Sequence, residues 1–385
     1  MKNKTNLLLV SLVICIGLFI YLTIHHFQVQ LGTNGPNICS VSSKINCDAA
    51  AMSPYSEIAK IPVSVLGLAF SLVMFFLVLF DKFQWSDSSP EKNSLFKILF
   101  LASALISVVM ALLSFFAVKV ICPFCLLTYV FSFLNLYLAW SLYSSSKFDI
   151  NQFLTSKFNW SLAAIFVVTT WFISSYLQNQ YGLDMIKKYI PEKVQIWKNA
   201  PVVQFDLSLG LNQNTNAENT IIEFADFKCP HCKDAAENIH NFLSTRKDVR
   251  FVFKPFPLDG TCNPQISQKG DGSRCKMAAW SLCAEKLFQK GWEVHKYYFD
   301  NQEDLFSVTD LKETNQNISK KLNFNYDEVE KCSDSAETNN SIAKMSNEGL
   351  AGGVQGTPTV FLNSKKVEFG HGQLNLILKT LLDQK

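Results

Sequence analysis

Residues 119–129 read Lys-Val-Ile-Cys-Pro-Phe-Cys-Leu-Leu-Thr-Tyr, and this stretch separates two long apolar runs, Ile98–Val118 and Ile121–Tyr143. Together the two runs are too long for a single membrane crossing of roughly 20 residues. A break near Lys119–Pro123 therefore predicts a tight helical hairpin. The cysteines of Cys122-Pro-Phe-Cys125 fall where the second helix begins. They share one helix face, at the end whose dipole favours a thiolate.

Three further uncharged runs are long enough to span a bilayer, Leu7–Ile24, Ile61–Phe80 and Trp160–Leu177. The first run exceeds the roughly 7–15 residues of a signal-peptide core, and no small-x-small cleavage site follows His25. We expect a retained helix there and five membrane spans in total.

Composition divides the chain of 385 residues into an apolar part before Leu177 and a charged part after it, which predicts two domains. The net charge is only +3, and the sequence has no block of Lys or Arg. These features do not suggest nucleic acid as a partner.

The lysines of the short loops predict the orientation of the spans, because Lys and Arg favour the cytoplasmic side. A cytoplasmic N-terminus leaves three lysines outside (Lys44, Lys60 and Lys119) and seven inside (Lys2, Lys4, Lys82, Lys92, Lys97, Lys147 and Lys157). The same orientation places Cys39 and Cys47, the Cys122–Cys125 motif and everything after Leu177 on the outer, oxidising side. We therefore expect a multi-pass protein of the bacterial cytoplasmic membrane with its C-terminal domain in the periplasm.

Cys39 and Cys47 lie in a polar segment that follows Gly32, Gly35 and Pro36, so we expect them in a loop. They form either a static disulfide or a shuttle pair for electrons, and spacing alone leaves both open. A zinc site normally takes four protein ligands, and His25 and His26 are the only histidines in the apolar part. Redox chemistry without a metal is the favoured interpretation.

The charged part contains a second C-x-x-C motif, Cys229-Pro-His-Cys232. It follows a linker rich in Asn and Gln (Asn212–Asn219) and a strand expected over Thr220–Phe227, and it opens a helix that runs towards Leu243. A strand that leads directly into such a helix is typical of the thioredoxin fold. The helix start stabilises a Cys229 thiolate, and we expect His231 to add a positive or hydrogen-bond-donating group.

A second strand is expected over Val249–Phe256, followed by an amphipathic helical insertion at about Arg274–Cys332. The four other cysteines of this domain allow three pairings. We favour two structural disulfides, one that closes a Gly-rich loop and one that ties two helices of the insertion: Cys262–Cys275 and Cys283–Cys332.

Residues 7–143 resemble the vitamin K epoxide reductase family, which has two loop cysteines, a Ser after the second, and a C-x-x-C at a helix start followed by Tyr. The matching residues are Cys39, Cys47, Ser53, Cys122, Cys125 and Tyr129. The resemblance implies that the loop cysteines shuttle electrons, that Cys122 exchanges with Cys47, and that Cys125 faces a quinone. Ser53 and Tyr129 would bind that quinone.

One departure from the family concerns the start of the second span. The vertebrate enzymes have an Asn there, whereas residues 61–65 read Ile-Pro-Val-Ser-Val. This difference puts reduction of an epoxide in doubt more than reduction of a quinone.

The Cys-Pro-His-Cys centre resembles DsbA-like oxidases, and residues 200–385 share their pattern. Gly353–Phe361 is similar to the family's loop and strand, in which Pro358 would be a cis proline beside the active site. Thr357 and Pro358 would then line the substrate groove. The whole chain looks like a bacterial homologue of vitamin K epoxide reductase fused to its own DsbA-like partner.

These observations predict a multi-domain protein. An all-α transmembrane four-helix bundle (1–145) would be followed by a fifth linking helix with a linker (146–199) and by an α/β thioredoxin-like domain with a helical insertion (200–385). The expected function is thiol oxidation of reduced secreted or periplasmic proteins, with the membrane quinone pool (ubiquinone or menaquinone) as the electron acceptor. Two alternatives remain open: a quinone-epoxide reductase that takes electrons from the thioredoxin-like domain, and a membrane-tethered chaperone without redox turnover.

Overall fold

The computed structural model describes residues 2–31, 39, 45–85, 90–143, 156–244, 246–370 and 373–383. The expected glycines and proline before Cys39 lie outside these residues, as do Lys44 and Lys147. Contacts between Cα atoms divide the chain into two compact units, Met1–Lys188 and Tyr189–Lys385, and each is described by itself.

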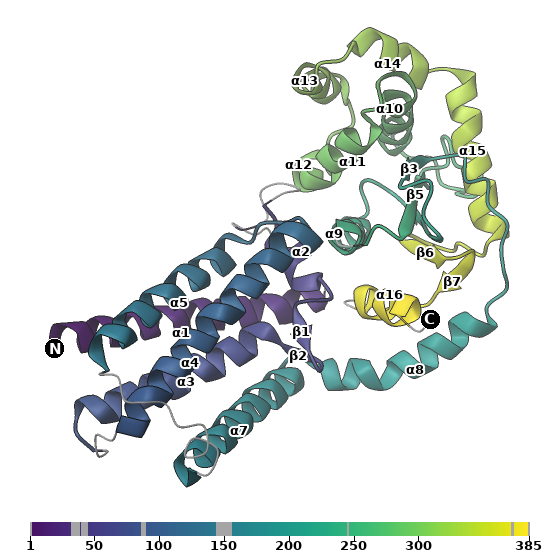
Figure 1. The fold of residues 1–385 in the computed structure, drawn as a ribbon. Coiled ribbons are helices and arrows are strands. Elements are labelled where there is room, and N and C mark those ends of the chain that lie inside the picture. The colour runs from purple at the N-terminus through teal and green to yellow at the C-terminus, as the bar shows by residue number, and fades with distance from the viewer. Residues whose placement is uncertain are drawn as a thin grey trace. The chain divides into compact units, whose positions relative to one another are not determined.

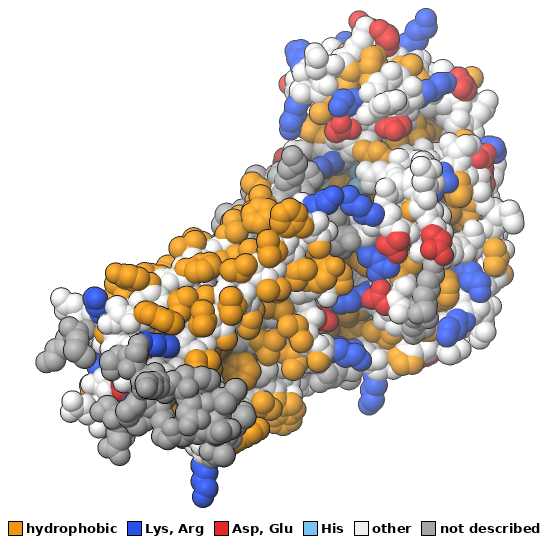
Figure 2. Space-filling model, in the orientation of Figure 1, with side chains coloured by type: hydrophobic (Ala, Val, Ile, Leu, Met, Phe, Trp, Pro, Cys, Tyr) orange, Lys and Arg blue, Asp and Glu red, His pale blue; other side chains and the backbone are white. Residues whose placement is uncertain are grey.

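The first unit is helical, and five of its described helical segments are long and apolar enough to cross a membrane. Figure 2 shows hydrophobic side chains gathered over the surface of this unit. The chain is therefore a multi-pass membrane protein with five candidate spans, as predicted. The elements in chain order are α1 (Lys2–Gln30), α2 (Cys47–Met52), β1 (Glu57–Ile58), β2 (Ile61–Pro62), α3 (Val63–Lys82), α4 (Pro90–Leu112), a π-helical turn (Leu113–Val118), α5 (Pro123–Leu142) and α7 (Lys157–Gln180) (Figure 1).

The hairpin between α4 and α5 has a local cause. Lys119 takes a left-handed backbone conformation with φ of 60°, which ends the helical path after the π-helical turn. Pro123 opens α5, where its missing N–H removes no hydrogen bond, and Cys122 caps the helix by accepting from the N–H of Cys125 at 3.2 Å. The break predicted at Lys119–Pro123 is present, and it places both cysteines at the start of the helix.

Helix α1 packs against α3 and α5, α4 packs against α5, and α7 packs against α3. The Phe27 and Tyr181 rings stack with their centroids 5.5 Å apart, so α1 and α7 end on the same side of the bundle. A hairpin of β1 and β2, joined through the pair Ile58–Ile61, also lies on that side, between α2 and α3. Cys15 of α1 has a free thiol that is buried inside the bundle, where Asn135 donates to its sulfur at 3.8 Å.

The second unit contains a sheet whose described strands have the order β3-β5-β4-β6-β7. Strands β4 and β5 are parallel, while the other neighbours are antiparallel. This is the predicted thioredoxin-like α/β domain, and its mixture of charged and apolar surface is visible in Figure 2. The bounds are α8 (Leu183–Asn199, which crosses the boundary between the units), β3 (Leu211–Gln213), β4 (Asn219–Ala225), α9 (Pro230–Ser244), β5 (Val249–Pro255), β6 (Thr359–Leu362), β7 (Lys365–Val367) and α16 (Leu374–Asp383).

The predicted insertion consists of a series of helices, and α15 then leads back to the sheet. The helices are α10 (Ser273–Phe288), α11 (Gly291–Asp300), α12 (Gln302–Leu305), α13 (Lys312–Leu322), α14 (Tyr326–Ser333) and α15 (Ala336–Ala351). In this domain the structure pairs Cys262 with Cys275 and Cys283 with Cys332. The second disulfide joins α10 to α14.

One expectation was wrong: the segment Asn212–Asn219 is not wholly a linker, because its first residues belong to β3. Asn212 pairs with Val252 of β5, and Arg250 donates to the Asn212 side chain at 2.6 Å. Polar side chains suit an edge strand with one open side. The polar composition of this segment therefore predicted a linker where the structure has a strand.

Candidate functional site

Two cysteine pairs meet in the first unit. We name Cys39 and Cys47 the loop pair and Cys122 and Cys125 the helix pair, and each pair forms a disulfide in the structure. Cys47 begins α2, whose first turn is capped by the Asn46 side chain at 2.9 Å from the N–H of Ala49. These caps hold Cys47 of the loop pair and Cys122 of the helix pair at the beginning of a helix, where backbone N–H groups favour a thiolate.

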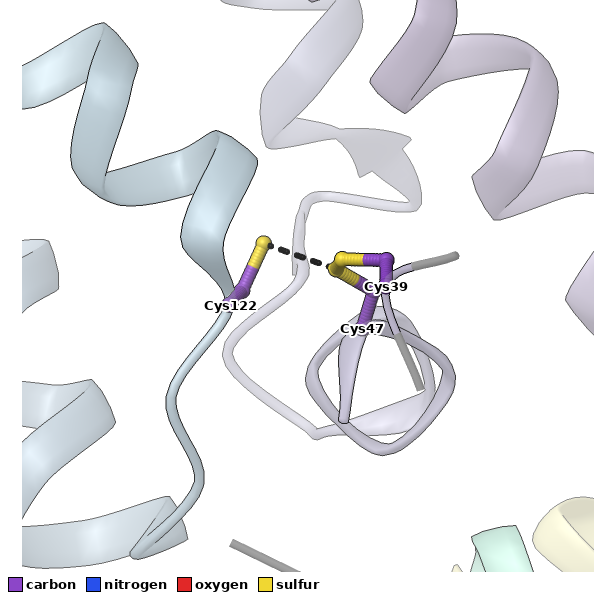
Figure 3. A group of neighbouring side chains, drawn as sticks. All are labelled: Cys39, Cys47 and Cys122. Carbon is purple, nitrogen blue, oxygen red and sulfur yellow. Dashed lines mark hydrogen bonds between the residues drawn. A yellow bond between two sulfur atoms is a disulfide. The ribbon is translucent and has the colours of Figure 1, made fainter. Parts of the chain in front are cut away.

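The loop pair and the helix pair are in contact. The Sγ atoms of Cys47 and Cys122 are 3.4 Å apart, and those of Cys39, Cys47 and Cys122 all lie within 4.8 Å of one another. Figure 3 shows the Cys122 side chain pointing toward the disulfide of the loop pair. All three residues are buried, with exposures of 1–3%. Metal ligation would require free thiolates, whereas these sulfur atoms are bonded in disulfides. The arrangement suits exchange of a disulfide between the two pairs.

A cavity of about 130 Å³ opens beside these pairs. Cys47 and both cysteines of the helix pair line it, together with Ser53 and Tyr129. Structure therefore brings the two predicted quinone-binding residues to the same cavity as Cys125. The cavity walls also include His25 and His26 of α1, which the sequence interpretation considered only as metal ligands.

A second, more apolar cavity of about 640 Å³ adjoins the first. The two share Tyr129 and four other lining residues, namely Phe19, Val63, Met110 and Thr128. Trp160 and Phe166 of α7 form part of its wall. The fifth span is therefore more than a link, because it completes an apolar chamber against α3.

In the second unit, Cys229 and Cys232 form what we name the substrate pair. Cys229 directly precedes α9, and both thiols are free and buried in this structure. A hydrogen bond from the Cys232 thiol is the largest influence that lowers the pKa of Cys229, to about 6, and contacts with Thr357 and backbone N–H groups add to it against the effect of burial. Burial raises the pKa of Cys232 well above its ordinary value. The pair thus combines a nucleophilic thiolate with a buried resolving thiol.

The other predicted residues of this site surround Cys229. The Cys229 thiol lies 3.5 Å from the Thr357 carbonyl oxygen, and the Thr357–Pro358 peptide bond is cis. The His231 side chain is exposed, and its backbone N–H is one of several groups that hydrogen-bond the Cys229 thiolate, after the Cys232 thiol.

Two residues near the substrate pair were missed from the sequence. Glu223 is fully buried in β4 with no hydrogen-bond partner among the described residues, and burial raises its pKa to about 8, with the Cys229 thiolate adding to the shift. Gln302 of α12 donates to the carbonyl oxygens of Phe227 and Cys229 at 2.8 and 3.0 Å and thereby fixes the turn before α9. An acidic residue inside the apolar run of β4 was the available signal for Glu223, whereas nothing local marked Gln302.

These geometries define a membrane thiol–disulfide oxidoreductase with two domains. Comparison with known families agrees: residues 6–140 match the vitamin K epoxide reductase family, and residues 211–378 match a thioredoxin family. Residues 6–140 therefore form a vitamin K epoxide reductase family domain, which is followed by a thioredoxin-like domain over residues 211–378.

Two curated relatives are similar to parts of the chain. The Na(+)/H(+) antiporter NhaA 3 of Salinispora tropica is 26% identical over 157 residues, which are 41% of this chain but only 21% of the antiporter. Disulfide bond formation protein D of Bacillus subtilis is 26% identical over 169 residues, which are 40% of this chain and 67% of that protein. The chain thus matches about a fifth of the antiporter's length.

Solved structures are also similar to about half of the chain. The crystal structure of oxidised BdbD from Bacillus subtilis is 20% identical, covers 48% of this chain and 97% of its own, and has a TM-score of 0.39. The thiol-disulfide exchange protein α-DsbA2 from Wolbachia pipientis is 19% identical, covers 51% and 97%, and has a TM-score of 0.37.

Proposed function

We propose that this protein is a membrane thiol oxidase that forms disulfides in other proteins and passes the electrons to a membrane quinone. Electrons would enter at the substrate pair, cross the loop pair and the helix pair, and leave to ubiquinone or menaquinone. The observation that carries the proposal is the 3.4 Å distance between the sulfur atoms of Cys47 and Cys122 in a buried cluster. Sulfur atoms in contact can exchange a disulfide through a mixed disulfide.

The pKa of Cys229 supports electron entry at the substrate pair. A thiolate stabilised to a pKa of about 6 favours the reduced form of the pair, so the oxidised pair is a strong oxidant of other thiols. Glu223, with its raised pKa of about 8, is suited to accept the proton of the buried Cys232 thiol during resolution. This direction of flow favours an oxidase over a reductase.

The two cavities support a quinone as the final acceptor. Ser53 and Tyr129 bring hydroxyl groups to the small cavity beside Cys125, and these can donate to the oxygens of a quinone ring. The apolar 640 Å³ cavity suits an isoprenoid tail. When bound, a quinone supplies an acceptor for two electrons and two protons, which is what oxidation of one dithiol releases.

Each transfer balances without a metal. A dithiol of one pair attacks the disulfide of the next, one S–S bond breaks as another forms, and two electrons and two protons move on. The substrate pair ends as a disulfide and is ready for another protein.

The topology proposed from the lysine bias has the N-terminus in the cytoplasm and the thioredoxin-like domain in the periplasm. The Phe27–Tyr181 stack brings the ends of α1 and α7 to the same side of the bundle, which supports a topology in which the chain leaves its last span on the side where α1 ends. Reduced secreted or periplasmic proteins are the partners that this topology offers.

The test is quinone reduction by the purified full chain in lipid, supplied with a reduced, unfolded cysteine-containing protein. We expect one quinone reduced per disulfide formed, and no quinone reduction by Cys125→Ala. The control is the Cys262→Ala/Cys275→Ala variant, which leaves all three redox pairs intact and should retain turnover. Disulfide formation without quinone reduction would contradict the proposal, and turnover of a quinone epoxide alone would favour the reductase alternative.

A further inference from the structure

A buried histidine–aspartate pair lies beside the two cysteine pairs of the bundle. Nε2 of His25 is 2.9 Å from Oδ1 of Asp48, and the two side chains are only 4% and 2% exposed. His25 belongs to the span α1, and Asp48 follows Cys47 in the first turn of α2. The pair thus joins a membrane helix to the segment that carries the loop pair.

His25 also lies close to the helix pair. It lines the small cavity together with Cys47 and both cysteines of the helix pair. The Tyr21 ring stacks on His25 with centroids 5.9 Å apart, and it also packs 4.5 Å from the ring of Phe124, which stands between the two cysteines of the helix pair. His25 therefore lies within the wall that connects the two disulfides.

The chemistry in this cavity requires a base. Thiolates, not thiols, attack disulfides, and the sulfur atoms of Cys47 and Cys122 are buried away from water. Ionisable side chains in a membrane span are costly, and such residues commonly serve a function. A neutral imidazole can accept a proton, and a neighbouring carboxylate stabilises the imidazolium that results.

We propose that His25, held by Asp48, is the proton acceptor for disulfide exchange between the loop pair and the helix pair, an inference that rests on the relay proposed above. The Cys47 thiol gives its proton to the imidazole, and its thiolate attacks Sγ of Cys122. The Cys47–Cys122 bond forms as the Cys122–Cys125 bond breaks, and Cys125 leaves as a thiolate that takes the proton from His25. Cys39 then attacks Cys47 and releases Cys122, so that the helix pair is reduced and the loop pair is oxidised.

Other ionisable groups surround the same cavity. Glu57 of β1 faces His26 at 3.3 Å rather than His25, and Gln30 hydrogen-bonds His26 at 2.9 Å. Among the described residues there, the other ionisable groups apart from the cysteines are the phenols Tyr21, Tyr55 and Tyr129. Both imidazoles have a carboxylate nearby, but Asp48 is closer to its histidine, is only 2% exposed against 21% for Glu57, and directly follows Cys47 in α2. These features assign the role of acceptor to His25.

The test follows exchange without any quinone. The full chain is oxidised, mixed with dithiothreitol, quenched with acid and alkylated, and mass spectrometry then reports the reduction of each pair over time. In His25→Gln the loop pair should be reduced as fast as in the unchanged protein, whereas reduction of the helix pair should lag about 100-fold at pH 7, within the range of general base catalysis. The lag should shrink about tenfold per pH unit as hydroxide replaces the lost base, and a merely structural role would not produce this dependence.

Two further variants complete the test. Asp48→Asn, which keeps the side chain's shape, should show a lag of about tenfold with the same pH dependence, and it decides the matter if His25→Gln does not fold. His26→Gln should keep the pH profile of the unchanged protein. Unaltered exchange in Asp48→Asn, or an equal lag in His26→Gln, would overturn the proposal. Failure of quinone reduction in a protein whose exchange depends on His25 would instead count against the proposed function.

Discussion

The two thiols of the substrate pair differ in pKa although they are one helical turn apart. Cys229 accepts hydrogen bonds at the start of α9, which lowers its pKa to about 6, whereas burial raises the pKa of Cys232. A substrate disulfide bond can therefore form first with Cys229. Glu223, buried in the neighbouring strand, supplies the group that can later remove the proton of Cys232.

Alkylation of the reduced protein should report this difference. We expect the rate at Cys229 to rise with pH and to reach half its maximum at about pH 6, because the thiolate is the reactive form. The same shift stabilises the reduced folded state: the contribution is complete above the ordinary pKa of 9.0 and is lost as the pH falls through about 6. Mass spectrometry of iodoacetamide adducts gives the rates, with Cys229→Ser as the control, and a midpoint near pH 9 would contradict the account.

At the scale of single residues, the sequence predicted those candidate site residues that belong to motifs of recognisable spacing. The six redox cysteines, Ser53 and Tyr129 fall at recognisable intervals. In the bundle, all of these residues except Cys39 line one cavity, and Cys39 is bonded to Cys47. Residues that reach the site only because the chain folds belong to no motif of recognisable spacing. Asp48 meets His25 across 23 positions of sequence, and Gln302 reaches Cys229 from a separate helix, so only tertiary structure reveals them.

The elements show the same division. Long apolar runs made the five spans predictable, since a bilayer demands length and apolarity and little else. Strand β3 was hidden because its ladder partner β5 lies some 40 positions away along the chain, and its polar side chains resemble those of a linker. The role of α7 in the apolar cavity was hidden for the same reason, since the face that a span turns to its neighbours depends on packing.

The two structural disulfides of the thioredoxin-like domain should stabilise it unequally. Cys283 and Cys332 are 49 positions apart and Cys262 and Cys275 are 13, so the first closes the larger loop in the unfolded chain. Loop entropy gives about 4 kcal/mol for the first and about 3 kcal/mol for the second.

Paired Ala substitutions therefore should lower the melting temperature of the thioredoxin-like domain more for Cys283/Cys332 than for Cys262/Cys275. Thermal unfolding of the oxidised full chain measures this order, with the fully reduced protein as the control in which both variants lose their disadvantage. A reversed order would show that native contacts of the Gly-rich loop outweigh chain entropy.

For the whole molecule, the proposed function requires one side of the membrane to hold every redox pair. A thiol reagent that cannot cross membranes should label Cys229 in intact spheroplasts after reduction, because the lysine bias places the thioredoxin-like domain outside. Buried Cys15 should remain unlabelled and serves as the internal control. Labelling of Cys229 only after permeabilisation would reverse the topology.

The central claim is that electrons pass from the substrate pair to the loop pair within one chain. Because both pairs belong to one polypeptide, their effective concentration is roughly millimolar, and the exchange should be independent of protein concentration. In this step the Cys229 thiolate is the attacking sulfur, since it lies at the start of α9 and has the lowered pKa, while Cys232 is buried a turn further on.

The most direct measurement uses the Cys232→Ser/Cys47→Ser variant, which lacks both resolving thiols. Because it also lacks both disulfides, mild oxidation with copper phenanthroline supplies the acceptor for the two electrons that are released when Cys229 and Cys39 join. Proteolysis and mass spectrometry should then find Cys229 joined to Cys39 as a cross-linked peptide pair that disappears on reduction. Cys229 joined to Cys122 would contradict the account, because it would show that the loop pair is a structural disulfide outside the electron path.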